Sequence, residues 1–168
     1  MKKMMLFVFM TGFLLRLSAG KSQDLPFRET IEYINSLLKA NPYVDTFLEI
    51  IFYYSIDIST DKELVVKMEF DGPFKTILKS KIRDLNLSPQ KDSTYDNPGS
   101  ICWNCMTNDL TNKKKCVINE TIPTDGESEF HSSDNICVMF SKQNEVRYKL
   151  IRAFDKLFKE VLQSGSKE

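Results

Sequence analysis

Apolar residues recur at helical spacing near the start of the chain. Over residues 27–38 the positions that fall on one side of a helix are Phe27, Ile31, Ile34, Leu37 and Leu38. Asp24 can cap such a helix before Pro26 in its first turn, and Asn41-Pro42 can end it. The pattern therefore predicts an amphipathic helix over residues 27–38.

The next segment changes to the alternation of a half-buried strand. Tyr54, Ile56 and Ile58 alternate with Ser55 and Asp57, and the same period continues over residues 64–70. A five-residue polar loop, residues 59–63, separates the two runs. We expect residues 47–70 to form a β-hairpin on which the first helix packs.

Apolar residues return to helical spacing after Asp71-Gly72-Pro73, so we expect a second helix that ends at Asn86. Residues 88–100 hold prolines, a glycine and short polar residues, and indicate a loop or linker. Short strands are expected over residues 101–106, 116–119 and 136–140. The polar loops expected between them cover residues 107–115 and 120–135.

A strongly amphipathic helix is predicted for residues 144–164. One arc of it carries Val146, Leu150, Ile151, Phe154, Leu157, Phe158, Val161 and Leu162. Packing in the core is the favoured interpretation of this arc. The alternative is a surface for a partner or a membrane, carried by Ile151, Phe154, Leu157, Phe158 and Val161.

The first residues have the order of a secretory signal peptide. Lys2 and Lys3 precede an apolar run, and the small residues Ser18, Ala19 and Gly20 follow it. We expect residues 1–20 to be removed and residues 21–168 to form a single secreted domain.

Charge and motifs argue for binding rather than catalysis. The 168-residue chain has 23 basic and 23 acidic residues, and loss of residues 1–20 leaves an acidic excess, so a nucleic-acid partner is not expected. The single histidine, His131, is expected in a solvated loop, and no motif for acyl or phosphoryl transfer is present. We therefore expect a protein that is not an enzyme and uses no metal or cofactor. Its partner would be an extracellular protein or receptor, with membrane contact only through the C-terminal helix.

All four cysteines, Cys102, Cys105, Cys116 and Cys137, lie in the secreted part, where two disulfides are expected. Three connectivities are possible, although a bond between Cys102 and Cys105 would strain a tight loop. The segment before Cys102 lacks the strand of a redox site, and a zinc site would usually show a second close pair.

Two sequons predict exposed glycosylation sites. Asn119-Glu120-Thr121 is the stronger, because Pro89 directly follows the second, Asn86-Leu87-Ser88.

The stretch Leu25-Pro26-Phe27-Arg28-Glu29-Thr30, leading into an amphipathic helix, resembles the opening of cathelicidin proregions, which have the cystatin-like fold. The resemblance implies an α+β protein with a helix wrapped by an antiparallel sheet, acting in defence or signalling. It also implies that Cys105 and Cys116 match the spacing of that family's first disulfide, with Cys102 and Cys137 outside the pattern. The inhibitory Gln-x-Val-x-Gly hairpin of protease-binding cystatins is absent, since the corresponding loop reads Ser59-Thr60-Asp61-Lys62.

The leading hypothesis is thus a secreted, disulfide-stabilised glycoprotein that binds a protein. One alternative is a short-chain helical cytokine, which would need helices over residues 27–40, 74–85 and 146–162 and no hairpin over residues 47–70. A second is a host-defence precursor that releases a membrane-active C-terminal helix.

Overall fold

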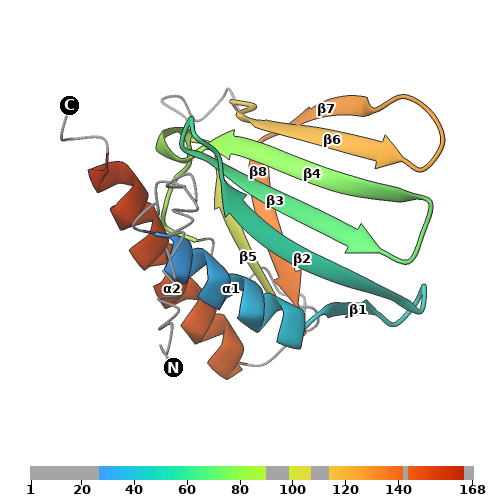
Figure 1. Ribbon diagram of the computed structural model, residues 1–168, viewed down its shortest axis with the longest axis horizontal. Helices are drawn as coiled ribbons and strands as arrows, with labels where there is room; N and C mark the ends of the chain where they lie inside the picture. Colours follow the sequence, from blue (N-terminus) through green and yellow to red (C-terminus); the bar gives the residue numbers. More distant parts are fainter. Residues whose placement is uncertain (1–26, 90–98, 107–113, 142–143, 165–168) are drawn as a thin grey trace, which may run out of the picture.

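The computed structural model describes residues 27–89, 99–106, 114–141 and 144–164. Two helices and a two-stranded sheet gather at one end of a larger, six-stranded antiparallel sheet (Figure 1). The turns that join β1 to β2, β3 to β4 and β6 to β7 lie at the opposite end of the large sheet, away from the helices (Figure 1). The expected α+β class with an antiparallel sheet, two disulfides and a C-terminal helix is confirmed. The expected signal peptide, residues 1–20, lies outside the described residues.

Helix α1 (Arg28–Ala40) buries one stripe of side chains: Thr30, Ile34 and Leu38. Their four-residue spacing places them on one face. The helix ends at Asn41, whose backbone N–H donates to the carbonyl of Leu38 and whose side chain donates to the carbonyl of Leu37 at 2.8 Å. Pro42 follows directly and cannot extend a helix.

The large sheet has the order β1-β2-β3-β4-β6-β7. Its strands are β1 (Tyr43–Asp45), β2 (Ile50–Ile58), β3 (Glu63–Phe70), β4 (Phe74–Lys81), β6 (Val117–Pro123) and β7 (Glu129–Ser133). The predicted hairpin is present as β2 and β3, with Ile56 opposite Val66 on the buried face.

The predicted second helix is wrong, because residues 74–81 form β4 and only Ile82–Asp84 forms a short 3₁₀ turn, η1. β4 pairs with β3 on one side and β6 on the other. Two of its inward positions are Thr76 and Ser80, which are buried. Polar residues at inward positions hide the two-residue period, and pairing on both edges overrides the helical spacing.

The second sheet pairs β5 (Gly99–Asn104) with β8 (Asn135–Phe140), where strands were expected. Strand β5 begins at Gly99, so the loop predicted over residues 88–100 is wrong at its last two positions. Residues 90–98 of that loop lie outside the described part of the chain. The loop predicted over residues 120–135 is also wrong, since β6 continues to Pro123 and β7 follows.

Both disulfides form, one within the small sheet and one between the sheets. Cys102 bonds Cys137 directly across β5 and β8, and Cys105 bonds Cys116 between the end of β5 and the start of β6. The Cys105–Cys116 disulfide is the one whose spacing matches the family resemblance. It ties the small sheet to the large one at the end where the helices lie.

Helix α2 (Asn144–Gln163) is present, as the amphipathic pattern predicted, and its apolar side covers the small sheet. Trp103 of β5 is buried beneath it, with its ring 4.6 Å from Phe154 and 5.4 Å from Phe158 between centroids. Thr30 of α1 donates a hydrogen bond to Glu160 of α2 at 3.1 Å. The core is therefore concentrated at the disulfide-bonded end of the molecule.

Candidate functional site

The turn between β1 and β2 is held by the side chain of Asp45. Its Oδ1 accepts hydrogen bonds from the backbone N–H groups of Phe47, at 2.9 Å, and Leu48, at 3.0 Å. Glu49 adopts a left-handed conformation, with φ of 55°, and Ile50 then pairs with Asp45. Local hydrogen bonds of this kind define the backbone of a turn. The backbone positions from which the side chains of Phe47 and Leu48 extend are therefore well defined.

These two side chains are exposed although they are large and apolar. Phe47 is 92% exposed and Leu48 is 55% exposed. Burial of a phenylalanine side chain stabilises a fold by about 1.5–3 kcal/mol, and the fold gains almost none of that here. A single exposed apolar residue is common, so the surroundings of Phe47 decide whether it indicates a binding site.

Three more exposed apolar side chains adjoin the turn on the outer face of the large sheet. Val44 lies opposite Ile51 across β1 and β2, and Tyr53 follows on the same face. Their exposed fractions are 44%, 43% and 47%. We name the whole group the hairpin surface: Val44, Phe47, Leu48, Ile51 and Tyr53. Several exposed apolar side chains on one turn and the strands that it joins are typical of an interaction site.

The rim of the hairpin surface carries acidic side chains. Glu69 lies directly opposite Tyr53 across β2 and β3, Glu49 is part of the turn, and Asp71 follows the end of β3. All three are exposed. These three carboxylates add negative charge beside the apolar group, and Lys67, opposite Ser55 on the same face, adds one positive charge.

The inner face of the same hairpin is anchored by a row of aromatic rings. Tyr43, Phe52, Phe70 and Phe74 come from β1, β2, β3 and β4, and successive ring centroids are 5.6, 5.2 and 4.8 Å apart. Aromatic pairs at these separations attract beyond the burial of their area. Because the inner side is anchored, the outer side is presented on a stiff support.

Burial and local charge raise the pKa of two tyrosines beneath the hairpin. Burial is the largest cause for Tyr43, followed by the negative charge of Asp45 and a hydrogen bond to it, and all three raise its pKa. Burial, with a smaller contribution from Tyr43, raises the pKa of Tyr54 to about 12. The Tyr54 hydroxyl also donates to the sulfur of Met68 at 3.1 Å. Both phenols therefore stay neutral at physiological pH and act as apolar support.

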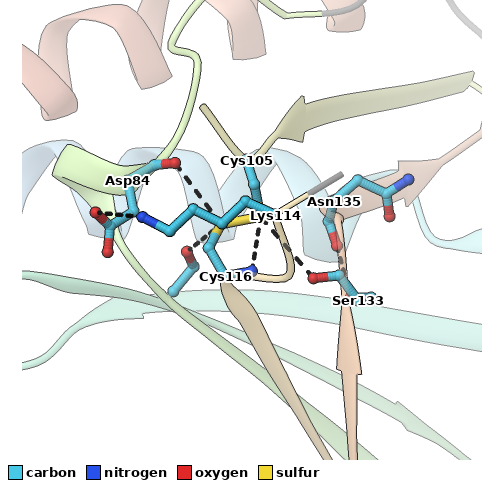
Figure 2. The surroundings of a disulfide bond; sticks show 7 residues. Asp84, Cys105, Lys114, Cys116, Ser133 and Asn135 are labelled. Atoms are coloured by element: carbon cyan, nitrogen blue, oxygen red, sulfur yellow. Dashed lines mark hydrogen bonds and ion pairs between the residues drawn. A yellow bond between two sulfur atoms is a disulfide. The ribbon is translucent and has the colours of Figure 1, made fainter. Parts of the chain in front are cut away.

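The cysteines form a structural cluster rather than a reactive site. The Cys116 backbone N–H donates to Sγ of Cys105 at 2.9 Å. Figure 2 shows Lys114 reaching Asp84 beside this disulfide, with 3.8 Å between Nζ and Oδ1. On the other side the Ser133 hydroxyl donates to the carbonyl of Asn135 at 3.0 Å, as Figure 2 also shows. All four cysteines of the chain are oxidised, so no thiolate is present to attack or to bind a metal.

The two sequons differ in accessibility. Asn86 is exposed, and its Oδ1 accepts a hydrogen bond from the Ser88 N–H at 3.1 Å. Asn119 is half-buried in β6, where its Oδ1 is buried without a hydrogen bond among the described residues. Asn86 therefore lies at the surface and Asn119 only partly so, and glycosylation of both residues stays a prediction.

The proposed partner or membrane face of the C-terminal helix points into the core. Phe154, Leu157, Phe158 and Val161 are at most 2% exposed, and Ile151 is half-buried. These side chains pack on the small sheet and on α1, so the alternative interpretation of them as an open surface is corrected. No helix in the described part of the chain is long and apolar enough to span a bilayer.

His131 lies on β7 and not in a loop as expected. Its side chain is exposed, and its Nε2 is 3.7 Å from Oε2 of Glu129 on the same strand. Among the described residues no group of three or more His, Cys, Asp or Glu side chains is placed to hold a metal ion.

Sequence reasoning missed the hairpin surface, because it assigned Phe47 to a packed strand. The signal that marks the turn is Asp45, whose side chain can bond the backbone two and three residues ahead. No family model, curated protein or solved structure matches the chain.

Proposed function

We propose that the protein is secreted and acts by binding another protein through the hairpin surface, without catalysis. The observation that carries the proposal is the exposure of Phe47 on a turn fixed by Asp45. A partner that buries this ring gains the apolar energy that the fold itself forgoes, and the turn is already ordered before binding.

Charge suggests the chemistry of the partner. Because Glu49, Glu69 and Asp71 border the apolar group, a complementary partner carries an apolar pocket with lysine or arginine at its rim. Such charges orient an extracellular receptor or target protein as it approaches the hairpin surface. They contribute less to the affinity of the complex.

We further propose that the fold is related to that of cathelicidin proregions and other cystatin-like proteins, with a role in defence or signalling. A helix followed by an antiparallel meander, together with the Cys105–Cys116 disulfide, supports this relationship. The helical-cytokine alternative is not supported, because residues 74–81 form a strand. Release of a membrane-active C-terminal helix is not favoured either, because it would expose the apolar core beneath α2.

A photo-crosslinking experiment tests the binding surface. A benzophenone amino acid replaces Phe47 in the oxidised mature protein, and the probe is applied to the surface of cultured cells. A matched probe replaces Tyr148, which is 64% exposed on α2. We expect an adduct from position 47 that unlabelled wild-type protein competes away and a Phe47→Ser variant does not.

Equal adducts from both positions would contradict the proposal, as would equal competition by wild type and Phe47→Ser. Because Phe47 is 92% exposed, its replacement leaves folding intact. Circular dichroism of the variant checks this, so a lost adduct reports on binding.

A further inference from the structure

The two edges of the large sheet differ in how they are closed. At one edge β1 covers only Ile50–Phe52 of β2. Beyond β1, the Asn35 side chain accepts a hydrogen bond from the Ile56 N–H at 2.8 Å and donates one to the Ile56 carbonyl at 3.0 Å. Helix α1 thus satisfies the backbone that a further strand would otherwise use, and this edge is protected.

The other edge is strand β7, whose outer side pairs with no strand of the described residues. β7 is the last strand of the sheet and pairs with β6 among the described residues (Figure 1). Four of its five residues, Glu129, Phe130, His131 and Ser132, are exposed. The strand contains no lysine or proline, and none of its positions has a positive φ. Of the features that commonly blunt an edge it has a short length and one carboxylate, Glu129, which a pairing partner must accommodate.

We propose that β7 pairs antiparallel with β7 of a second copy of this chain, which extends the two sheets into one. The register places Phe130 on the two-fold axis, facing Phe130 of the second copy. Glu129 then lies opposite His131 of the second copy, and the reverse pair forms on the other side of the axis.

Complementary side chains favour this register over its neighbour, because an imidazole N–H can donate to a carboxylate. With Phe130 on the axis, a carboxylate meets an imidazole twice, at the Cβ separation of about 5 Å that is usual for directly opposite residues. A register centred on His131 would place the two imidazoles opposite each other and leave Glu129 opposite Ser133. The first arrangement gains two favourable pairs that the second lacks.

The outer face adds apolar contact to the same register. Phe130 is 64% exposed and lies opposite Glu120 of β6, with Ile118 and Ile122 as its diagonal neighbours. Ile118 is itself 52% exposed. Pairing of two copies covers both phenylalanine rings and lengthens this apolar stripe across the two-fold axis, which favours association.

The dimer does not depend on the proposed function, but it would change how the hairpin surface is displayed. β1 and β7 are at opposite edges of the six-stranded sheet, so joining two β7 strands puts the two hairpin surfaces at the far edges. Strands spaced about 4.8 Å apart place those edges on the order of 50 Å from each other. Such a dimer is bivalent.

Cysteine crosslinking tests the register. All native cysteines are paired, so one introduced cysteine supplies the only free thiol. On oxidation of the full secreted protein we expect Phe130→Cys to form a covalent dimer with itself. Glu129→Cys and His131→Cys should each stay monomeric alone and crosslink when mixed, because only the mixed pair lies directly opposite.

The exposed Phe47→Cys variant serves as the control for random collision. The proposal is overturned if Phe130→Cys dimerises no faster than this control. It is equally overturned if Glu129→Cys crosslinks with itself as readily as with His131→Cys. The readout is dimer formation, which is independent of any adduct formed by the hairpin surface, so the two proposals can fail separately.

A charge exchange tests the pairing without a covalent bond. His131→Glu puts like charges opposite each other twice, and sedimentation equilibrium should show dimerisation weakened roughly tenfold or more. Adding Glu129→Lys to that variant places opposite charges across each pair and should restore most of the dimer. Wild-type protein that sediments as a monomer at every concentration, or a double variant weaker than His131→Glu, would refute the proposal.

Discussion

Replacement of Asn35 by alanine should destabilise the protein by removing the closure of the β2 edge. The side chain makes two hydrogen bonds with Ile56, one to the N–H at 2.8 Å and one to the carbonyl at 3.0 Å. No other described side chain replaces it, because β1 ends its pairing at Phe52. Asn35→Ala therefore leaves both backbone groups of Ile56 without a protein partner.

The magnitude follows from three contributions. Two hydrogen bonds contribute about 1 kcal/mol each to the free energy of unfolding. Alanine restores about 0.6 kcal/mol through its higher helix propensity. A cleft of about 390 Å³ beside Asn35 and Ile56 admits water, so the full penalty for an unsatisfied buried group does not apply. The expected loss is about 1.5 kcal/mol, or about 3–6 °C in Tm for a domain of this size.

Urea unfolding, followed by circular dichroism on the oxidised protein, measures this loss. Ser36→Ala is the matched control, because Ser36 is exposed on the same helix and its hydroxyl bonds only the carbonyl of Tyr33, at 2.7 Å. The control should change stability by less than about 0.5 kcal/mol. If Asn35→Ala matched the control, the side chain would contribute nothing to edge closure and the contrast between the two sheet edges would lose its basis.

Two further substitutions test the core and the buried tyrosine. Phe158 is 2% exposed and packs on Trp103, so Phe158→Ala should lower the free energy of unfolding by about 3–5 kcal/mol. Tyr148→Ala, on the exposed side of α2, should lower it by less than about 0.5 kcal/mol in the same urea titration. Because burial raises the pKa of Tyr54 to about 12 from its usual value of about 10, the folded state holds this proton more tightly than the unfolded state. The stability that this difference contributes is fully present below pH 10 and is lost as the pH rises toward 12. Tyr54→Phe should therefore reduce the fall of the unfolding free energy between pH 10 and pH 12. An unchanged fall in the variant would contradict the raised pKa of Tyr54.

Helix α2 and the β2–β3 hairpin could be predicted because their apolar residues follow one clear period. In α2 the apolar arc stays on one side over twenty residues, and in β2 Tyr54, Ile56 and Ile58 alternate with polar neighbours. Each element buries one face against the core, so pattern and tertiary environment agree. The period of apolar residues predicts an element best when that element buries one face and exposes the other.

β4 and β7 could not be predicted because their environment does not follow their hydrophobicity. β4 buries Thr76 and Ser80 on its inner face, so a polar residue stands where the strand pattern needs an apolar one. β7 is an exposed edge, and little of its sequence has to be apolar for it to pair with β6. Partners supplied by distant parts of the chain determine both strands, and a local pattern cannot contain that information.

The disulfide connectivity was left open for a similar reason. Cys102 and Cys137 bond because β5 and β8 pair in a register that puts them opposite each other, thirty-five residues apart in the chain. The candidate site is a harder case still. Phe47 looks like a core residue by type, but it lies in a turn held by Asp45, and its ring is 92% exposed.

Stability and recognition are separated along the length of the large sheet. The disulfides, Trp103 and the apolar face of α2 lie at the helix-covered end, while the β1–β2 turn lies at the other end (Figure 1). Between them runs the aromatic row that begins at Tyr43, which couples β1 to the strands of the core. Substitution of Phe47, which is 92% exposed, should therefore alter binding without altering stability. Loss of Phe52, in the aromatic row, should instead weaken binding by loosening β1 even though its half-buried ring contacts no partner.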